Sequence, residues 1–304
     1  MSATEREYSA GTVEHSPRES GLFAASGKKS GHGTIAWLPA PSYEMPDSPP
    51  WQPADRPPVI ALLDSGVQDH PWLPTSGAQP FVLDAGDYGW QSPLPGEGEG
   101  EGAGEDEDYS SHWGHATFIA GLIRLAAPGA QVLSMRVMSS DGKVRESHAA
   151  SALNWLADNP ASAGGIDVDV VLMAFGRPDD PDDRDLAELR SPIGKLGDRG
   201  VRIVASAGND GAERPVYPAA FAADAGLRGG SVVSVGALAT PVERAPYSNF
   251  GPWVTRWYKG TNVISIMPLT TKSSGPPPGD GYAWWSGTSF AAAVQAGQLA
   301  AGLP

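Results

Sequence analysis

The chain of 304 residues contains no cysteine, so neither a disulfide framework nor a catalytic thiolate is available to it. It also lacks any run of 18 consecutive apolar residues, so no membrane-spanning helix is predicted. Residues 1–21 contain charged and turn-forming residues but no apolar stretch of the kind found in signal peptides. We therefore expect a cytoplasmic protein without a membrane partner.

Basic residues are few compared with acidic ones: 21 Lys and Arg stand against 35 Asp and Glu, and the net charge is −14. Binding to nucleic acid depends on clustered Lys and Arg that contact phosphates, so nucleic acid is not an expected partner. Half of the acidic excess lies in one place, because residues 97–108 (EGEGEGAGEDED) contain seven carboxylates and no basic residue.

Glycine alternates with glutamate in this acidic loop, residues 96–108, and such alternation is typical of a mobile, solvated segment. The alternative hypothesis is that the loop attracts basic residues of a substrate, together with a second acidic cluster in residues 177–185. Carboxylates also suit Ca²⁺, but neither segment has the ligand spacing of a known calcium loop. A structural calcium is therefore chemically permitted without being predicted, and we expect no required cofactor.

Glycine and proline are abundant, with 38 and 29 residues, which indicates long connections between regular elements. Eight prolines fall between positions 39 and 58, as in an extended linker. We expect residues 1–57 to be a proline-rich N-terminal extension and residues 58–304 to be one domain. Within the extension, residues 33–38 (GTIAWL) are the only predicted strand.

From residue 58 onward, short β-branched apolar runs alternate with helical segments. The predicted strands cover 58–64, 130–138, 168–176, 201–209 and 231–238, and the predicted helices cover 115–126, 146–158, 183–198 and 288–302. Near-continuous apolar strands separated by helices indicate an α/β fold: a doubly wound, mostly parallel sheet with helices on both faces. In such sheets the functional groups gather at the carboxyl ends of the strands.

Four polar residues occupy such positions. Asp64 directly follows the apolar run VIALL, and Asn209 follows a strand and a glycine. His115 opens one predicted helix and Ser289 lies at the start of another. Taken singly, each fits an unremarkable role, because Asp and Asn are common in turns and Ser commonly caps a helix.

Two histidines, His112 and His115, could each be a base. His115 lies in the first turn of its predicted helix, where the positive end of the helix dipole disfavours the imidazolium form. A neutral base would then be available near pH 7 unless a carboxylate offsets the dipole. His112 lies in the irregular approach to that helix, where we expect a solvated loop residue.

Taken together, the four residues suggest acyl transfer. A serine at a helix start can present its Oγ and its backbone N–H on the same side, and an asparagine amide can donate to a developing oxyanion. Asp, His and Ser in this chain order match one of the recurrent serine-hydrolase triads.

The segments around these residues, LLDSGV, GHATFIAG, AGNDG and SGTSFAAA, resemble in order the motif blocks of the subtilisin-like serine proteases, or subtilases. The resemblance covers about residues 58–304. It implies that Ser289 is the nucleophile, His115 the general base, Asp64 the orienting carboxylate and Asn209 the oxyanion donor. It also implies a substrate-binding role for the strand that borders the specificity pocket, here Ala174, Phe175 and Gly176, and for Gly208.

The chain departs from the family pattern in several places. Ala293 replaces the usual proline after the serine, Phe290 replaces a methionine, and Phe118 stands where many members have a second histidine. The chain stops 15 residues after Ser289, so it is short at its C-terminus, and the family's terminal helices do not follow. We therefore expect the serine helix to be covered by the N-terminal extension or by a second subunit, which would make the protein a homo-oligomer.

The extension is too short and too rich in proline for a typical folding pro-domain, so we expect an enzyme that folds without one. A short inhibitory segment lying at the active site is the alternative. The expected function is that of a serine endopeptidase that cleaves peptide bonds of peptide or protein substrates through an acyl-enzyme. Two other hypotheses keep the fold: an enzyme of peptide maturation or cyclisation that uses the same triad, and a non-catalytic peptide-binding module.

Overall fold

The computed structural model describes residues 7–9, 35–38, 56–94, 112, 114–139, 142–179, 186–269 and 281–303. The helices are α1 (His115–Ala126), α2 (Glu146–Asp158), α3 (Ala187–Asp198) and α4 (Thr288–Ala301), with 3-10 helices η1 (Ala85–Tyr88), η3 (Ala161–Ala163) and η4 (Ala219–Ala223). The strands are β1 (Glu7–Ser9), β2 (Ala36–Leu38), β3 (Val59–Asp64), β4 (Val82–Asp84), β5 (Gln131–Arg136), β6 (Lys143–Arg145), β7 (Val170–Met173), β8 (Arg177–Pro178), β9 (Arg202–Ser206), β10 (Val216–Tyr217), β11 (Val232–Leu238), β12 (Arg256–Lys259), β13 (Val263–Ile266) and β14 (Tyr282–Trp285).

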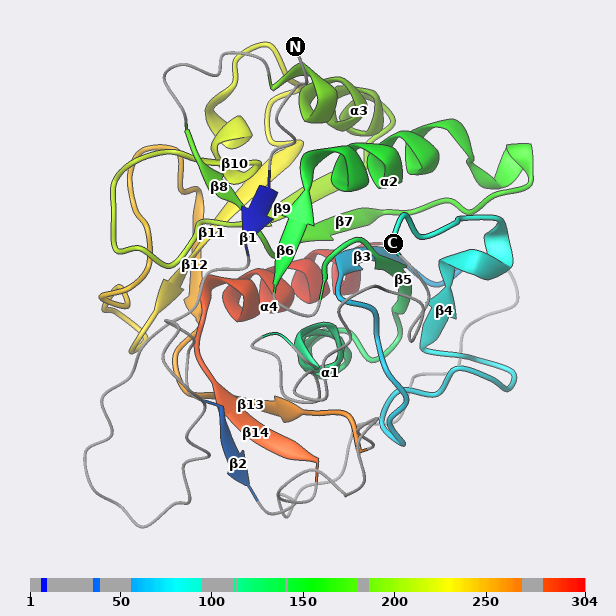
Figure 1. The fold of residues 1–304 in the computed structure, drawn as a ribbon, viewed down its shortest axis with the longest axis horizontal. Helices are drawn as coiled ribbons and strands as arrows, with labels where there is room; N and C mark the ends of the chain where they lie inside the picture. Colours follow the sequence, from blue (N-terminus) through cyan, green and yellow to red (C-terminus); the bar gives the residue numbers. More distant parts are fainter. Residues whose placement is uncertain are drawn as a thin grey trace.

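A seven-stranded sheet in the order β12-β11-β9-β7-β3-β5-β4 forms the centre of the molecule, and every neighbouring pair in it is parallel. All six residues of β3 (VIALLD) are buried, as expected for a central parallel strand covered on both faces. Parallel strands need helical crossovers, and these place α2 and α3 on one face and α1 and α4 on the other (Figure 1). The predicted doubly wound α/β fold is confirmed.

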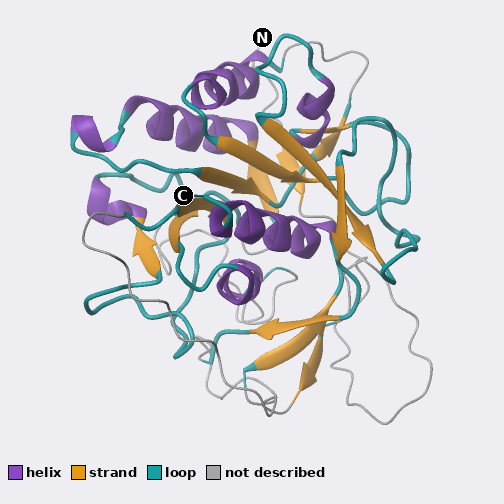
Figure 2. Cartoon of the chain, turned by 180° about the vertical axis from the view of Figure 1, so that it is seen from behind, coloured by secondary structure: helices purple, strands orange, loops and turns teal. Residues whose placement is uncertain are grey.

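Two hydrophobic cores lie on the two faces of the sheet. One core joins alternate residues of the strands to α1, α4 and the strands β13 and β14 of the small antiparallel sheet. The other joins the remaining strand residues to α2 and α3. Figure 2, seen from behind, shows the same layers. Since side chains alternate along a strand, a single apolar strand supplies both cores.

Helix α4 is mostly buried, and its contacts depend on small residues. A Cβ at Gly297 would lie 2.7 Å from the Cβ of Ala126, so the glycine permits α1 and α4 to approach closely. Ala293, which takes the place of the family's proline, is fully buried in the core against the sheet. Within the described residues, α4 contacts α1 and the strands β3, β7, β9, β11 and β12, and the predicted cover by the extension or a second subunit stays a prediction.

The predicted helices 115–126 and 146–158 coincide with α1 and α2, and the predicted helix 288–302 ends one residue earlier, as α4. The described part of helix 183–198 begins at Ala187 as α3, and the acidic loop 96–108 lies outside the described residues.

The prediction of only one strand in residues 1–57 is wrong. Besides β2, which pairs with β14, the structure has β1, which pairs with β6. A strand of three residues is too short to show a recognisable pattern of apolar residues. The sequence near it also gives no sign of its pairing partner, which lies more than 130 residues away.

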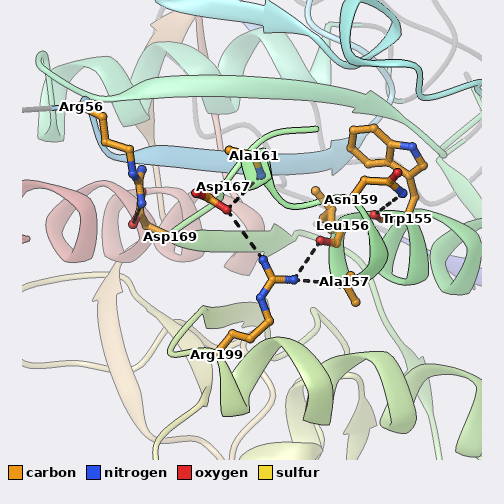
Figure 3. A network of polar contacts seen from close by, with 9 residues as sticks. All are labelled: Arg56, Trp155, Leu156, Ala157, Asn159, Ala161, Asp167, Asp169 and Arg199. Carbon is orange, nitrogen blue, oxygen red and sulfur yellow. Dashed lines mark hydrogen bonds and ion pairs between the residues drawn. The ribbon is translucent and has the colours of Figure 1, made fainter. Parts of the chain in front are cut away.

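The amino edge of the sheet is held by ion pairs (Figure 3). Both terminal nitrogens of the Arg56 guanidinium donate to the carboxylate of Asp169 at 2.7 Å. Asp169 precedes β7 and also accepts the backbone N–H of Val59 at 2.8 Å, so it ties the start of β3 to the start of β7. Nearby, Arg199 donates to the carbonyl of Ala157 at 2.8 Å and joins the ends of α2 and α3.

None of the helices within the described ranges is both long enough and apolar enough to cross a membrane.

Candidate active site

Asp64 and His115 meet at the carboxyl edge of the sheet. Asp64 is the last residue of β3, and His115 is the first residue of α1. His115 Nδ1 lies 2.9 Å from Asp64 Oδ1 and 3.0 Å from Oδ2. Asp64 Oδ1 also accepts the backbone N–H of Ser65 at 2.8 Å, which helps to orient the carboxylate. Asp64 is fully buried and His115 is 2 % exposed, so water screens this pair little.

The partner of His115 determines which ring nitrogen carries the proton. An ionised carboxylate only accepts hydrogen bonds, so Nδ1 is the protonated nitrogen and Nε2 holds the lone pair. An imidazole in this tautomer can accept a proton at Nε2, and the buried carboxylate lies where it can balance the resulting charge.

Ser289 is the second residue of α4 and is 2 % exposed. Its Oγ donates a hydrogen bond of 3.0 Å to the carbonyl of Ala174. Ala174 is the residue that directly follows β7. No hydrogen bond between Ser289 Oγ and His115 occurs among the described residues, although the next side chain, Phe290, contacts the His115 ring with centroids 5.7 Å apart. The Ser289 hydroxyl thus has the Ala174 carbonyl as its acceptor in this structure.

Asn209 follows the carboxyl end of β9 and is 9 % exposed. Its Oδ1 accepts two hydrogen bonds from Thr288, one from the backbone N–H and one from the hydroxyl, each at 2.9 Å. The Thr288 hydroxyl in turn accepts the N–H of Gly208 at 3.1 Å. Two donors on one side fix the oxygen of the amide toward Thr288, so Nδ2 points the other way.

Thr288 has a structural role at this site that the sequence alone does not reveal. In the structure Gly287 is the cap residue, and Oδ1 of Asn209 accepts the N–H of Thr288 at the start of α4. Thr288 thus connects the serine helix to the asparagine loop. Its place next to Ser289 is the signal that could have drawn attention to it.

The turn before Ser289 has a second support. Tyr247 donates its hydroxyl to the carbonyl of Gly260 at 2.9 Å, and the same carbonyl accepts the N–H of Gly287. Burial raises the pKa of Tyr247 to about 12, so the hydroxyl keeps its proton at neutral pH. These contacts hold the start of α4 at a fixed place relative to the sheet.

The residues predicted to bind substrate fall into two groups. Ala174 and Phe175 have fully buried side chains, and that of Phe175 packs in the core toward α2 and α3. These two residues can therefore meet a peptide only through their backbone. Gly176 and Gly208 are partly exposed; a Cβ at Gly176 would overlap Val216, and Gly208 has a φ of +95°. Their contact with substrate stays a prediction.

Aromatic rings surround His115. Trp285 lies 5.5 Å from it between ring centroids, and Phe118 and Phe290 both contact Trp285 and lie 4.6 Å from each other in a tilted arrangement. The expectation that His112 is solvated is wrong: it is 2 % exposed and its ring lies 5.4 Å from that of His115. It is enclosed because Gly142, where a Cβ would overlap the imidazole, folds over it.

Most of the acidic residues that could hold a cation or attract basic substrate residues lie outside the described part of the chain. The acidic loop and residues 180–185 of the second cluster are outside it. Within the described ranges, no three acidic or histidine side chains are grouped closely enough to hold a metal ion.

Comparison with known sequences gives consistent matches. The sequence model described as peptidase S8, subtilase family, matches residues 55–302. Subtilisin BL and subtilisin Savinase, both from Lederbergia lenta, are each 28 % identical to the chain over 250 residues, which covers 79 % of this chain and 74 % of the relative.

Solved structures of the same architecture are also similar. A lanthipeptide protease has a TM-score of 0.58 at 21 % identity, with 79 % of this chain and 71 % of that chain covered. The prenylagaramide maturation protease PagA has a TM-score of 0.56 at 21 % identity, with 79 % and 73 % covered. At this identity the likeness concerns the fold.

Proposed function

The chain belongs to the subtilase family and is a serine peptidase that acts on peptides or proteins, and from this premise we propose that Ser289, His115 and Asp64 form its catalytic triad. The observation that carries the proposal is the buried hydrogen bond between His115 Nδ1 and Asp64 at 2.9 Å, next to the start of the helix that bears Ser289. This bond leaves Nε2 of His115 as the basic atom.

Acylation would begin when the Ser289 hydroxyl turns from the Ala174 carbonyl toward His115. Nε2 takes the proton while Oγ attacks the substrate carbonyl carbon, and the resulting imidazolium is stabilised by Asp64. His115 then gives this proton to the leaving amine as the carbon–nitrogen bond breaks. A water molecule, deprotonated by the same Nε2, attacks the ester and releases the acid, and Ser289 recovers its proton.

The oxyanion of the tetrahedral intermediate needs donors that are already in position. We assign this role to Nδ2 of Asn209 and to the backbone N–H of Ser289. The Ser289 N–H lies in the first turn of α4, where amides have no acceptor within the helix and the dipole favours negative charge. Thr288 supports the assignment because its two bonds to Oδ1 hold the amide in one orientation.

Preference for basic substrate residues is a further part of the proposal. Its support is the concentration of carboxylates in residues 97–108, a few positions before α1 in sequence. Cleavage of peptides that contain Lys or Arg should exceed cleavage of neutral peptides at low salt, and the difference should shrink as ionic strength rises. Equal cleavage rates for basic and neutral peptides at low salt would contradict the proposed preference for basic residues.

The decisive experiment is the intact mass of the protein after treatment with a fluorophosphonate, which reacts with activated serines. We expect one adduct on the wild type and none on Ser289→Ala. Ser286→Ala is the matched control, because Ser286 is also buried but its hydroxyl accepts the N–H of Asn262 at 2.9 Å. An adduct that persists in Ser289→Ala, or is lost in Ser286→Ala, would contradict the assignment of the nucleophile.

A second fate of the acyl-enzyme is transfer to an amine, as in peptide maturation by cyclisation. Its support is limited to the names of two proteins of similar fold, one a maturation protease and one a lanthipeptide protease. The products distinguish the two fates: a hydrolysed peptide gains one water, whereas a cyclised fragment does not. Mass spectrometry of the products from one defined peptide therefore decides between them.

A further inference from the structure

His112 lies directly beside the proposed base. Its side chain is buried, and its ring centroid lies 5.4 Å from that of His115, with the two ring planes at 66° to each other. Two further rings border His115 at similar distances, Trp285 at 5.5 Å and Phe290 at 5.7 Å. The imidazole that would take the proton of Ser289 is therefore bordered by three other rings.

The hydrogen bond to Asp64 does not by itself fix the orientation of the His115 ring. Nδ1 of His115 lies almost equally far from the two carboxylate oxygens, at 2.9 and 3.0 Å. A ring held through one nitrogen can still tilt about that bond, because the outer torsion of histidine has broad minima. A tilt displaces Nε2, which is the atom that must receive the proton. The position of Nε2 therefore depends on what packs against the ring.

His112 is itself held on two sides. Its backbone carbonyl accepts the N–H of His115 at 3.0 Å, so the two histidines close one turn at the start of α1. On the other side lies Gly142, which has a φ of +81°, and a Cβ there would overlap Nδ1, Cε1 and Cγ of the His112 imidazole. The ring also contacts Trp285, with centroids 6.3 Å apart. His112 therefore has little freedom to move away from His115.

We propose that His112 is a positioning residue for the reaction: its ring keeps Nε2 of His115 where this atom can receive the serine proton. The inference rests on the proposed function, because His115 is the base of the proposed triad. The role requires no charge on His112. The Asp64 carboxylate can balance one buried imidazolium, and that one is His115 after it has taken the proton.

Loss of the His112 ring should affect the chemical step more than substrate binding. Without it, His115 gains space on one side and Nε2 is no longer held in place. Misplacement of a catalytic group by about 1 Å can lower the rate by about 10². Binding of substrate does not use Nε2, so KM should stay within about twofold. A side chain that only supported the fold would show no such separation of kcat from KM.

The test compares His112→Ala, which removes the ring, with His112→Phe, which keeps a ring but has no nitrogen that can titrate. His112→Asn is the second variant without a ring, and it keeps a polar side chain. His70→Ala is the matched control, because His70 is also a buried histidine with aromatic neighbours. We expect kcat to fall by about 10² in His112→Ala and His112→Asn, but to stay within about fivefold of wild type in His112→Phe and about twofold in His70→Ala.

A second measurement needs no turnover. A proton in a charge-assisted bond between an imidazole nitrogen and a buried carboxylate gives a signal far downfield in the proton NMR spectrum. In a Ser289→Ala background this signal reports the bond between His115 and Asp64, and its loss in Asp64→Asn identifies it. We expect the signal to be kept in His112→Phe and to broaden or move upfield in His112→Ala.

Wild-type kcat together with an unchanged signal in His112→Ala overturns the proposal. Equal losses of kcat in His112→Ala and His112→Phe overturn it too, because the ring would then not be the part that matters. If fluorophosphonate labels none of the proteins but His112→Ala still alters the signal, the positioning of His115 is supported and the proposed nucleophile is contradicted. Failure of the inference and failure of the proposed function are therefore distinguishable.

Discussion

Two aspartates lie at opposite ends of neighbouring strands of the central sheet. Their basic partners are of different kinds. Asp64 ends β3 at the carboxyl edge, is fully buried and bonds to His115. Asp169 precedes β7 at the amino edge, has a side chain that is 19 % exposed and is held by Arg56 (Figure 3). One partner is an imidazole, which can exist with or without its second proton, and the other is a guanidinium that stays charged.

The difference separates chemistry from architecture in this fold. The hydrogen bond to Asp169 raises the pKa of Arg56 still further, so the guanidinium keeps its charge. The carboxyl edge also gathers Asn209 and the start of α4, whereas the amino edge gathers the ends of α2 and α3 around Arg199. A carboxylate at a strand end is therefore informative about function only when its partner is known.

The largest expected effect is that of Asp64→Asn. An amide can donate to Nδ1 of His115 and so favour the tautomer whose Nε2 already carries a proton, which cannot act as base. We expect kcat to fall by about 10⁴, with far-ultraviolet circular dichroism unchanged. Asp169→Asn should leave kcat within about twofold. Comparable losses of kcat in both variants would break the comparison between the two edges.

Asn209→Leu should lower kcat by about 10² to 10³ with little change in KM, because the donor to the oxyanion acts in the transition state. This variant also leaves the N–H of Thr288 without its acceptor, so a loss could come from the helix start. Asn209→Asp separates the two causes, since it keeps an acceptor for Thr288 but has no amide donor. Steady-state kinetics of Asn209→Asp should show an equal or larger loss; recovery of activity in it would assign the role of Asn209 to holding α4.

Much of this arrangement could be predicted from the sequence because it depends on local patterns. The apolar runs that end at Asp64 and near Asn209 predicted strands of the central sheet, and the helix that starts at His115 was placed to the residue. The order of the motif blocks then predicted that these residues belong to one site at the carboxyl edge of the sheet.

Features that depend on long-range packing could not be predicted. β1 forms only because β6 offers an edge, and His112 is buried only because Gly142 folds over it. The orientation of the Asn209 amide follows from two donors on Thr288, 79 positions away. The bond between Arg56 and Asp169 spans 113 positions, and the sequence gives no reason to prefer it over other acidic partners.

His70 tests whether a buried titratable group at the carboxyl side can be purely structural. It accepts the N–H of Trp72 at Nδ1, packs against Tyr282, and burial lowers its pKa to about 4 from 6.5. Between these values the unfolded state binds the proton more tightly, so stability is complete above pH 6.5 and is lost as the pH falls toward 4. The expected loss between pH 8 and pH 5 is about 2 kcal/mol.

His70→Asn removes this titration while Oδ1 can still accept the N–H of Trp72. Urea unfolding at pH 8 and pH 5, both in a Ser289→Ala background, measures the difference. The asparagine variant should be less stable at pH 8, where it lacks the aromatic contacts, but should lose about 2 kcal/mol less than the histidine protein on acidification. The same pH-dependent loss in both proteins would mean that His70 is not the group responsible.

The smallest expected effect is that of Asp169→Asn on stability, because its partner Arg56 has a side chain that is 52 % exposed and well screened by water. The variant keeps one acceptor for the N–H of Val59 but loses the two charged bonds to the guanidinium, which should cost about 1 kcal/mol, or about 2–4 °C in Tm. Arg56→Lys retains the charge without the planar fork and should fall between the two. Thermal unfolding at low and high salt checks this, since added salt should reduce the difference between wild type and Asp169→Asn. A Tm loss of more than 10 °C would show that the amino edge is as critical to folding as the carboxyl edge is to the proposed chemistry.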